Sequence, residues 1–100
     1  MSTYTVVLAW DVDWAGYVAT CPAMRGASTQ GRTRDEALAN IREAMLGWME
    51  AATELGLTPA ADTADVVASG VAFALGWQAD EGWPLRVETA TVALPTPVAA

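Results

Sequence analysis

The stretch GASTQGRTRDEALANIREAM, residues 26–45, contains a short polar strand, a glycine and a strong helix start. Thr33 and Glu36 form an S/T-x-x-E capping box. In this motif the threonine hydroxyl accepts a hydrogen bond from the backbone N–H of the third helical residue, and the glutamate side chain accepts one from the backbone N–H of the N-cap residue. Asp35 and Glu36 also lie at the positive end of the helix dipole. The stretch therefore predicts a strand-to-helix junction, with a helix that begins directly after Thr33.

An apolar stripe continues this helix for about six turns. Gly56 is suited to cap its C-terminal end, and Pro59 prevents the helix from resuming at once. Gly47 costs about 1 kcal/mol relative to alanine inside a helix, which suggests a close backbone approach there. The stripe recurs at three- and four-residue steps and comprises Leu38, Ile41, Met45, Trp48, Ala52 and Leu55.

Three strands are predicted before the helix. Residues 2–10, STYTVVLAW, predict a strand whose side chains alternate between two faces. One face is expected in the core and the other at least partly exposed. The turn DVDWAG leads into a second strand at residues 17–21, which Pro22 ends. Residues 27–31, ASTQG, form a short polar third strand. The core row is Tyr4, Val6, Leu8 and Trp10, and the milder row is Thr3, Thr5, Val7 and Ala9.

Residues 62–79 allow two interpretations. A helix capped by Asp62 or Thr63 is favoured because apolar residues recur along one face. A hairpin that turns at Ser69 and Gly70 remains open, since the segment holds glycine and several β-branched residues. The apolar residues of the helical interpretation are Val67, Val71, Ala74 and Leu75.

The chain returns to a strand near its end. Residues 85–94, LRVETATVAL, predict a fourth strand that Pro95 stops, and residues 96–100 are expected to be a flexible tail. The predicted class is α+β in the order βββα(α)β: a three-stranded antiparallel sheet, a long helix, an additional helical segment and a returning fourth strand. One domain spanning residues 1–95 accounts for a chain of 100 residues.

Composition and charge exclude some classes of function and favour others. The apolar content of 53% and charged content of 17% fit a globular chain. No apolar run reaches the roughly 18 residues of a membrane span, and the N-terminus does not resemble a signal peptide, so we expect a cytoplasmic protein without a membrane partner. Residues 51–100 carry six acidic side chains against Arg86, and lysine is absent. A basic partner is therefore expected rather than direct nucleic-acid binding.

Residues of particular types recur at particular spacings through the first half of the chain. They are Tyr4, Val6, Asp13, Gly16, Tyr17, Val18, Ala19, Pro22, Gly26, Ser28, Gly31, Thr33, Glu36, Ala37, Asn40, Glu43 and Ala44. This pattern resembles the N-terminal domain of HicB-type antitoxins, a bacterial family, although Arg32 stands where the family usually has aspartate.

The resemblance implies a partial ribonuclease H-like fold. It also implies a partner, HicA, a small basic RNA-cleaving toxin whose active surface the antitoxin covers. The alternative is a solitary HicB-like domain that self-associates and has no toxin.

Catalytic chemistry is not expected. Two-metal phosphodiester cleavage needs several converging carboxylates, including one from the middle of the first strand, and that strand has none. Asp11 and Asp13 fall in the turn, where aspartate bonds the backbone. Cys21 has no histidine or lysine to activate it and is interpreted as a small strand hydrophobe. Asn40 is interpreted as a buried tie between helix and loop. We predict no catalytic residue, cofactor or metal.

Tryptophans supply the candidate partner site. Five are present, and tryptophan is enriched at protein interfaces because it removes a large area from water. The alternative role is to cover the apolar edge of the domain's own core. The candidate partner-binding residues are Trp14 in the first turn and, around an acidic loop, Trp77, Asp80, Glu81 and Trp83.

Sheet edges suggest self-association. The strands at residues 27–31 and 85–94 are expected to be exposed edges, and only Arg86 and Glu88 carry charge on them. Pairing across a two-fold axis would satisfy their backbone groups. We therefore expect a homodimer or homotetramer.

Overall fold

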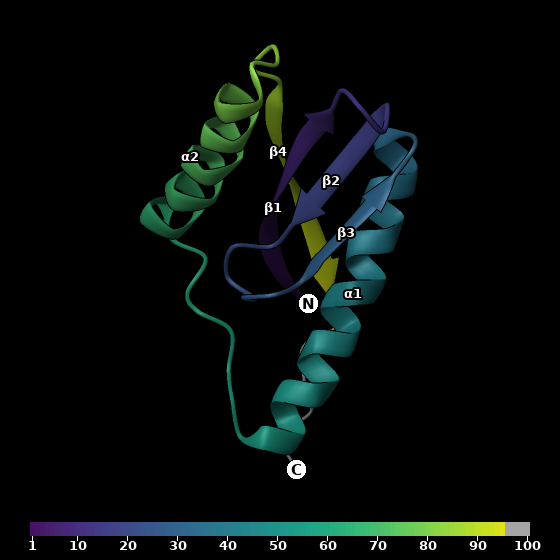
Figure 1. Cartoon of the computed structure of the whole chain (residues 1–100). Helices are drawn as coiled ribbons and strands as arrows, with labels where there is room; N and C mark the ends of the chain where they lie inside the picture. The colour runs from purple at the N-terminus through teal and green to yellow at the C-terminus, as the bar shows by residue number, and fades with distance from the viewer. Residues whose placement is uncertain (96–100) are drawn as a thin grey trace.

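Four strands form one antiparallel sheet in the order β3-β2-β1-β4, with helices α1 and α2 on opposite faces (Figure 1). This computed structural model describes residues 1–95, and the predicted flexible tail lies outside the described residues. The predicted α+β class and the returning fourth strand are confirmed. The elements are β1 (Ser2–Asp11), β2 (Gly16–Thr20), β3 (Ser28–Gly31), α1 (Arg34–Leu55), α2 (Ala64–Glu81) and β4 (Val87–Leu94).

Strand β1 is the centre of the sheet and is covered on both faces. It pairs with β2 over its second half and with β4 over most of its length. Val6 and Leu8 face α1, whereas Val7 and Ala9 belong to a second cluster with α2. All four side chains are buried. The expectation of a partly exposed second row is therefore wrong for Val7 and Ala9, because α2 packs over them.

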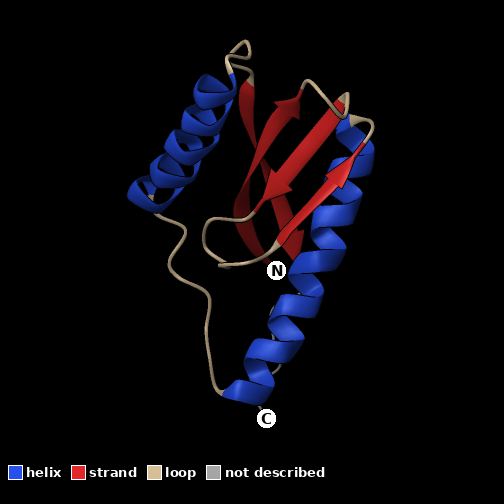
Figure 2. Ribbon diagram, in the orientation of Figure 1, coloured by secondary structure: helices blue, strands red, loops and turns tan. Residues whose placement is uncertain are grey.

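The main core lies between the sheet and α1. Trp48 is half-buried at its margin, and Leu55, predicted as part of the buried stripe, is 72% exposed. The reason is length: the last turns of α1 extend beyond the strands (Figure 2). The fully enclosed residues on this side include Val6, Leu8, Ala19, Met24, Ala37, Ile41, Met45 and Leu94.

The predicted junction before α1 is confirmed. Thr33 is the N-cap, and its hydroxyl accepts the Glu36 N–H at 3.1 Å. The carboxylate of Glu36 reaches back one residue further than a standard capping box and accepts the N–H of Arg32 at 3.3 Å. Gly56 ends the helix in the left-handed conformation, with φ of 71°.

The ambiguous segment is helical, which excludes the hairpin. Thr63 caps α2, and its hydroxyl accepts the Val66 N–H at 3.3 Å. Asp62 has a different role, because its carboxylate accepts the N–H and hydroxyl of Thr5 at 3.1 and 2.9 Å. The linker between the helices is thereby fixed to β1. Since α2 runs back along the sheet, β4 enters antiparallel to β1.

The backbones of β3 and α1 approach each other closely at Gly31, and no comparable approach occurs at Gly47. A Cβ placed on Gly31 would lie 2.4 Å from the Ala37 nitrogen, so β3 and α1 touch there through backbone. Around Gly47, apart from its chain neighbours and the backbone of its own helix, no atom lies within 4 Å of the corresponding point. The expectation of a close approach at Gly47 is wrong.

Replacement of Gly47 with alanine should raise the free energy of unfolding by about 1 kcal/mol, because alanine is the better helix former and the space is open. Urea unfolding measures the change. Gly31→Ala is the matched control and should be destabilising, since its methyl group meets backbone. A loss of stability in Gly47→Ala would contradict this description of α1.

Neither helix among residues 1–95 is both long and apolar enough to cross a membrane.

Candidate partner-binding site

The C-terminal end of α2 brings together four of the five predicted partner-binding residues. Trp77 and Trp83 meet edge to face, with ring centroids 5.1 Å apart. Asp80 and Glu81 lie in the last turn of α2 and are exposed. We call these four residues the acidic tryptophan corner; it lies where α2 turns into β4, at the top of Figure 1.

A helix-ending turn builds this corner. Gly82 adopts φ of 75° and its N–H donates to the Ala79 carbonyl at 3.0 Å. The next N–H, of Trp83, donates to the Gln78 carbonyl at 2.9 Å. The chain therefore folds back on α2, which brings the Trp83 ring against Trp77. Trp77 in turn packs against the cluster formed by Val7 and Ala9.

Gln78 fastens the corner to the sheet. Its side chain is fully buried, and its Nε2 donates to the carbonyls of Trp10 and Arg86 at 3.0 and 2.9 Å. Its Oε1 accepts the N–H of Arg86 at 2.9 Å. All of its hydrogen-bonding groups are used, which makes burial of an amide acceptable. The sequence contained a weak signal, because Gln78 follows Ala74 by four residues on the apolar face of α2.

The acidic charge of the corner is not neutralised within the described residues. Within residues 1–95 the ion pair is between Arg34 and Glu88, which lie outside the corner, and α2 has no basic residue in its last turn. Arg86 follows the corner, but its guanidinium lies over Trp10 at 4.6 Å and donates to the Tyr17 hydroxyl at 3.1 Å. The negative end of the α2 dipole adds to the carboxylates. The corner therefore presents negative potential beside two aromatic rings.

Trp14, the fifth predicted residue, contacts a different part of the chain. It lies on the turn between β1 and β2, where the Arg32 guanidinium stacks at 4.0 Å from its ring centroid and also donates to its carbonyl. Its ring covers Gly16. Asp11 accepts the Trp14 N–H at 2.9 Å, which confirms the predicted turn role of Asp11.

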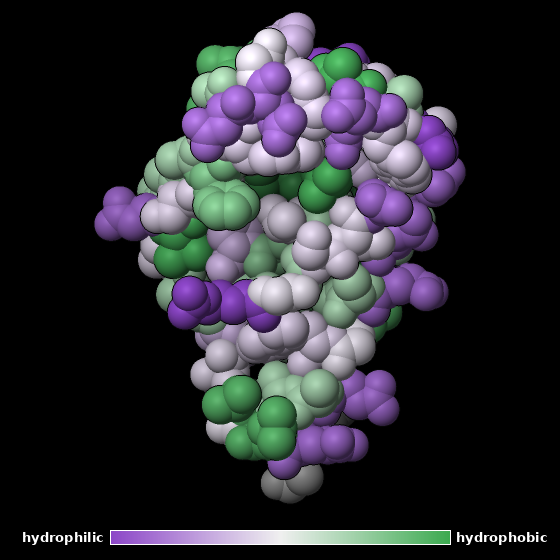
Figure 3. Space-filling model, viewed as in Figure 1, coloured by the Kyte–Doolittle hydropathy of each residue, from purple (hydrophilic) through white to green (hydrophobic). Residues whose placement is uncertain are grey.

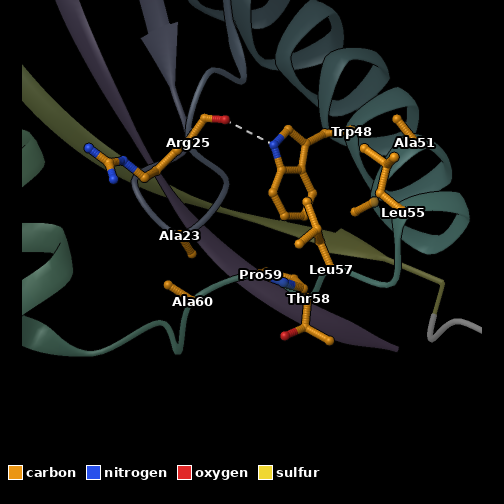
Figure 4. Close-up of a pocket in the computed structure, with 10 residues that line it drawn as sticks. Ala23, Arg25, Trp48, Ala51, Leu55, Leu57, Thr58, Pro59 and Ala60 are labelled. Atoms are coloured by element: carbon orange, nitrogen blue, oxygen red, sulfur yellow. Dashed lines mark hydrogen bonds between the residues drawn. The ribbon is translucent and has the colours of Figure 1, made fainter.

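An apolar pocket at the opposite end of the molecule was missed by the sequence analysis. It has a volume of about 580 Å³ and lies between the end of α1, the loop after β2 and the linker to α2 (Figure 4). The indole ring of Trp48 forms one wall of the pocket, and its N–H donates to the Arg25 carbonyl at 2.9 Å. Leu55 and Leu57, both largely exposed, form another. Figure 3 shows apolar surface at this end of the molecule.

The sequence contains one cysteine, Cys21. Burial raises the pKa of the Cys21 thiol, which is 2% exposed and lies one residue beyond β2. It packs as the small hydrophobe that the sequence predicts. Within residues 1–95, no three of histidine, cysteine, aspartate and glutamate are placed to hold a metal ion.

The fold is the one seen in the N-terminal domain of a HicB antitoxin. The N-terminal domain of the Burkholderia pseudomallei antitoxin HicB superposes with a TM-score of 0.67 at 24% identity, covering 95% of this chain and all of that one. The longer structure of the same antitoxin gives 0.65 at 23% identity, covering all of this chain and 74% of that one. At this identity the likeness establishes the fold.

Sequence relatives identify the family. The UPF0150 protein Ta0767 of Thermoplasma acidophilum is 47% identical over 47 residues, which are 47% of this chain and 67% of that protein. The UPF0150 protein ssr1765 of Synechocystis sp. is 45% identical over 47 residues, 58% of its length. No protein-family model matches the chain. The chain belongs to the UPF0150 family of HicB-like proteins, and the predicted resemblance is confirmed.

Proposed function

We propose that this protein is a HicB-like antitoxin that binds a small basic RNA-cleaving toxin of the HicA type and covers its active surface. The observation that carries the proposal is the acidic tryptophan corner, in which unneutralised carboxylates flank two preorganised aromatic rings. Support comes from the fold, since the two solved structures described above are of antitoxin HicB. In this role the chain binds and does not catalyse.

Charge makes the corner suited to such a partner. An RNA-cleaving protein presents basic side chains to phosphates, so carboxylates at its active surface compete directly with its substrate. The chain carries a net charge of −7, which accelerates its encounter with a basic protein at low salt. Asp80 and Glu81 supply this charge locally, at the point where the rings are also available.

Preorganisation makes the corner efficient. Interfaces obtain most of their binding energy from a few aromatic or arginine anchors, and ordering loose side chains reduces the gain. Trp77 and Trp83 already pack against each other, and the Gln78 hydrogen bonds hold their loop. Little further ordering is needed when a partner binds.

The placement of the acids also favours a binding role over a structural one. Negative side chains are unfavourable near a helix C-terminus, where the dipole is already negative. Asp80 and Glu81 therefore do not improve the folded state of the isolated domain. Acidic side chains placed against the dipole are typical of positions that serve function at some expense of stability.

Titration calorimetry tests the proposal, with a HicA-type protein sought as a small basic reading frame next to the gene for this chain. We expect saturable binding that weakens as sodium chloride is raised from 50 to 200 mM, because screening reduces the attraction between exposed charges. Absence of binding at 50 mM salt would overturn the proposal and leave the solitary, self-associating domain as the remaining function.

A further inference from the structure

Helix α2 covers only half of its face of the sheet. It packs against β1 and β4, where Val7, Ala9 and Val87 lie beneath it. A helix is about 10 Å across and neighbouring strands are about 4.8 Å apart, so one helix covers about two strands. On this face, no helix among residues 1–95 lies over β2 and β3 (Figure 1). A space about as wide as one helix is therefore open beside α2.

Alternate side chains of β2 and β3 form the floor of this space. Val18 and Thr20 lie opposite the residues of β1 that face α2, and residues directly opposite each other share a face of the sheet. Through the next ladder the same holds for Ser28 and Gln30 of β3. Val18 and Thr20 are half-buried, whereas Ser28 and Gln30 are exposed. The floor is therefore more apolar beside α2 and polar further out.

One flank of α2 forms the wall of the space. Gly70, Phe73 and Trp77 recur at three- and four-residue steps, so they share this flank. It faces β2 across a hollow of about 60 Å³, which Val18 and Thr20 also line. Phe73 is 82% exposed. A large aromatic side chain thus stands unburied beside an apolar hollow, which is typical of an interaction surface. We call the space between this flank and the floor the α2 groove.

The α2 groove is closed at one end and continues into the acidic tryptophan corner at the other. A Cβ on Gly70 would lie 2.5 Å from the Pro22 ring, so the loop after β2 closes the first end. Asp80 follows Gly70 by ten residues, which is about 15 Å along the helix. Trp77 borders both the groove and the corner. The two regions therefore form one continuous surface.

Contacts within the domain hold the floor in place. The Asn40 amide donates to the Gln30 carbonyl at 2.8 Å, which fastens β3 to α1. Asn40 is exposed rather than buried, so the predicted tie is present but lies outside the core. At the start of β2 the Trp14 ring covers Gly16, and the Arg32 guanidinium stacks on that ring. A partner meets a floor that is already ordered, which reduces the entropy lost on binding.

We propose that the α2 groove receives an α-helix of the basic toxin, lying beside α2 and antiparallel to it. The inference rests on the proposed function, because it extends the surface by which the corner binds that partner. A helix suits the space because its backbone is paired internally and its apolar residues at three- and four-residue steps meet Phe73 and Val18. In the antiparallel orientation its positive N-terminal end meets Asp80, Glu81 and the negative end of α2.

Charge favours the toxin over a second copy as the occupant. The groove leads to the carboxylates of Asp80 and Glu81, which form no ion pair within residues 1–95. A second copy carries a net charge of −7 and would meet these carboxylates with charge of the same sign. A basic protein is complementary to them, and complementarity of this kind selects one partner over another.

Replacement of Phe73 with serine tests the groove by calorimetry. We expect affinity for the basic toxin to fall by at least about tenfold, because an aromatic anchor is lost. The fold-change should be the same at 50 and 200 mM sodium chloride, since apolar contacts are not screened, whereas the loss in Asp80→Asn with Glu81→Gln should shrink as salt is raised. Leu55→Ser is the matched control. Leu55 is 72% exposed on α1, and its replacement should leave affinity within about threefold.

Protection of single thiols locates the bound helix. In a Cys21→Ala background, Gln30→Cys places a thiol on the floor of the groove, and Ala72→Cys places one on an exposed position of α2 outside it. The toxin should slow maleimide labelling of Gln30→Cys by at least about tenfold and leave Ala72→Cys within about twofold, because labelling follows exposure of the thiol. Far-UV circular dichroism verifies that each variant is folded.

The outcomes separate this inference from the proposed function. Absence of binding by the unmodified chain would overturn both. Binding by the unmodified chain, with unchanged affinity in Phe73→Ser or no protection of Gln30→Cys, would overturn the groove and leave the corner. An equal loss in Leu55→Ser would also overturn it. A smaller mass of free Phe73→Ser than of the free unmodified chain in light scattering would assign the groove to a second copy and so contradict the inference.

Discussion

Replacement of Gln78 with alanine should lower the free energy of unfolding by about 3 kcal/mol, because the part-buried Trp10 carbonyl and Arg86 N–H lose their partner and the Arg86 carbonyl keeps only the Trp10 N–H. Gln78 serves the carbonyl of Trp10 and both the N–H and the carbonyl of Arg86. Each buried polar group left unsatisfied costs about 1 to 3 kcal/mol, and partial entry of water reduces the sum. The cavity left by the side chain adds to the loss.

Urea unfolding of Gln78→Ala beside Gln30→Ala isolates this effect. Gln30 is exposed on β3, and its side chain takes part in no hydrogen bond within the described residues, so its replacement should change stability by less than about 0.5 kcal/mol. A loss below about 1 kcal/mol in Gln78→Ala would mean that the corner is not fastened to the sheet through this amide.

Removal of the corner's charge and of one ring should produce the largest effect on partner binding. We expect the triple variant Asp80→Asn, Glu81→Gln and Trp83→Ala to weaken binding of the HicA-type protein by at least about 100-fold, or about 2.7 kcal/mol. The carboxylates supply the attraction, and Trp83 supplies the apolar area beside Trp77. The isolated variant domain should retain its fold, because the two acids form no ion pair within residues 1–95.

Two controls locate the effect on the surface. Glu50→Gln with Glu54→Gln makes the same change in net charge on the exposed C-terminal half of α1 and should leave affinity within about threefold. Trp14→Ala tests the fifth predicted residue, which contacts Arg32 instead of the corner. Equal losses in the corner variant and the α1 control would show that net charge, not the corner, determines binding.

The sequence predicted the elements whose signals are local. Thr33, Glu36 and Gly56 define the ends of α1 through their own backbone and side-chain chemistry, and the structure places them there. The choice between helix and hairpin at residues 62–79 depended on packing. Gly70 weakened the helical interpretation, yet a Cβ there would lie 2.5 Å from the Pro22 ring, so glycine allows α2 to approach the loop after β2.

The candidate site was predictable to the extent that its residues are neighbours in sequence. Trp77, Asp80, Glu81 and Trp83 fall on one helix end and its turn, so they had to lie together. Gln78 was missed because one of its partners, Trp10, is 68 residues away. Leu55 was misassigned to the core because helical periodicity does not reveal where the sheet beneath the helix ends.

Growth rescue tests the central claim, that this protein neutralises a basic toxin, most directly. A HicA-type protein, sought as a small basic reading frame next to the gene for this chain, is expressed alone, with this chain, and with the Asp80→Asn, Glu81→Gln, Trp83→Ala variant at equal abundance. We predict growth arrest in the first case, restored growth in the second, and arrest again in the third. Normal growth with the HicA-type protein alone, or continued arrest in the presence of the unmodified chain, would contradict the account.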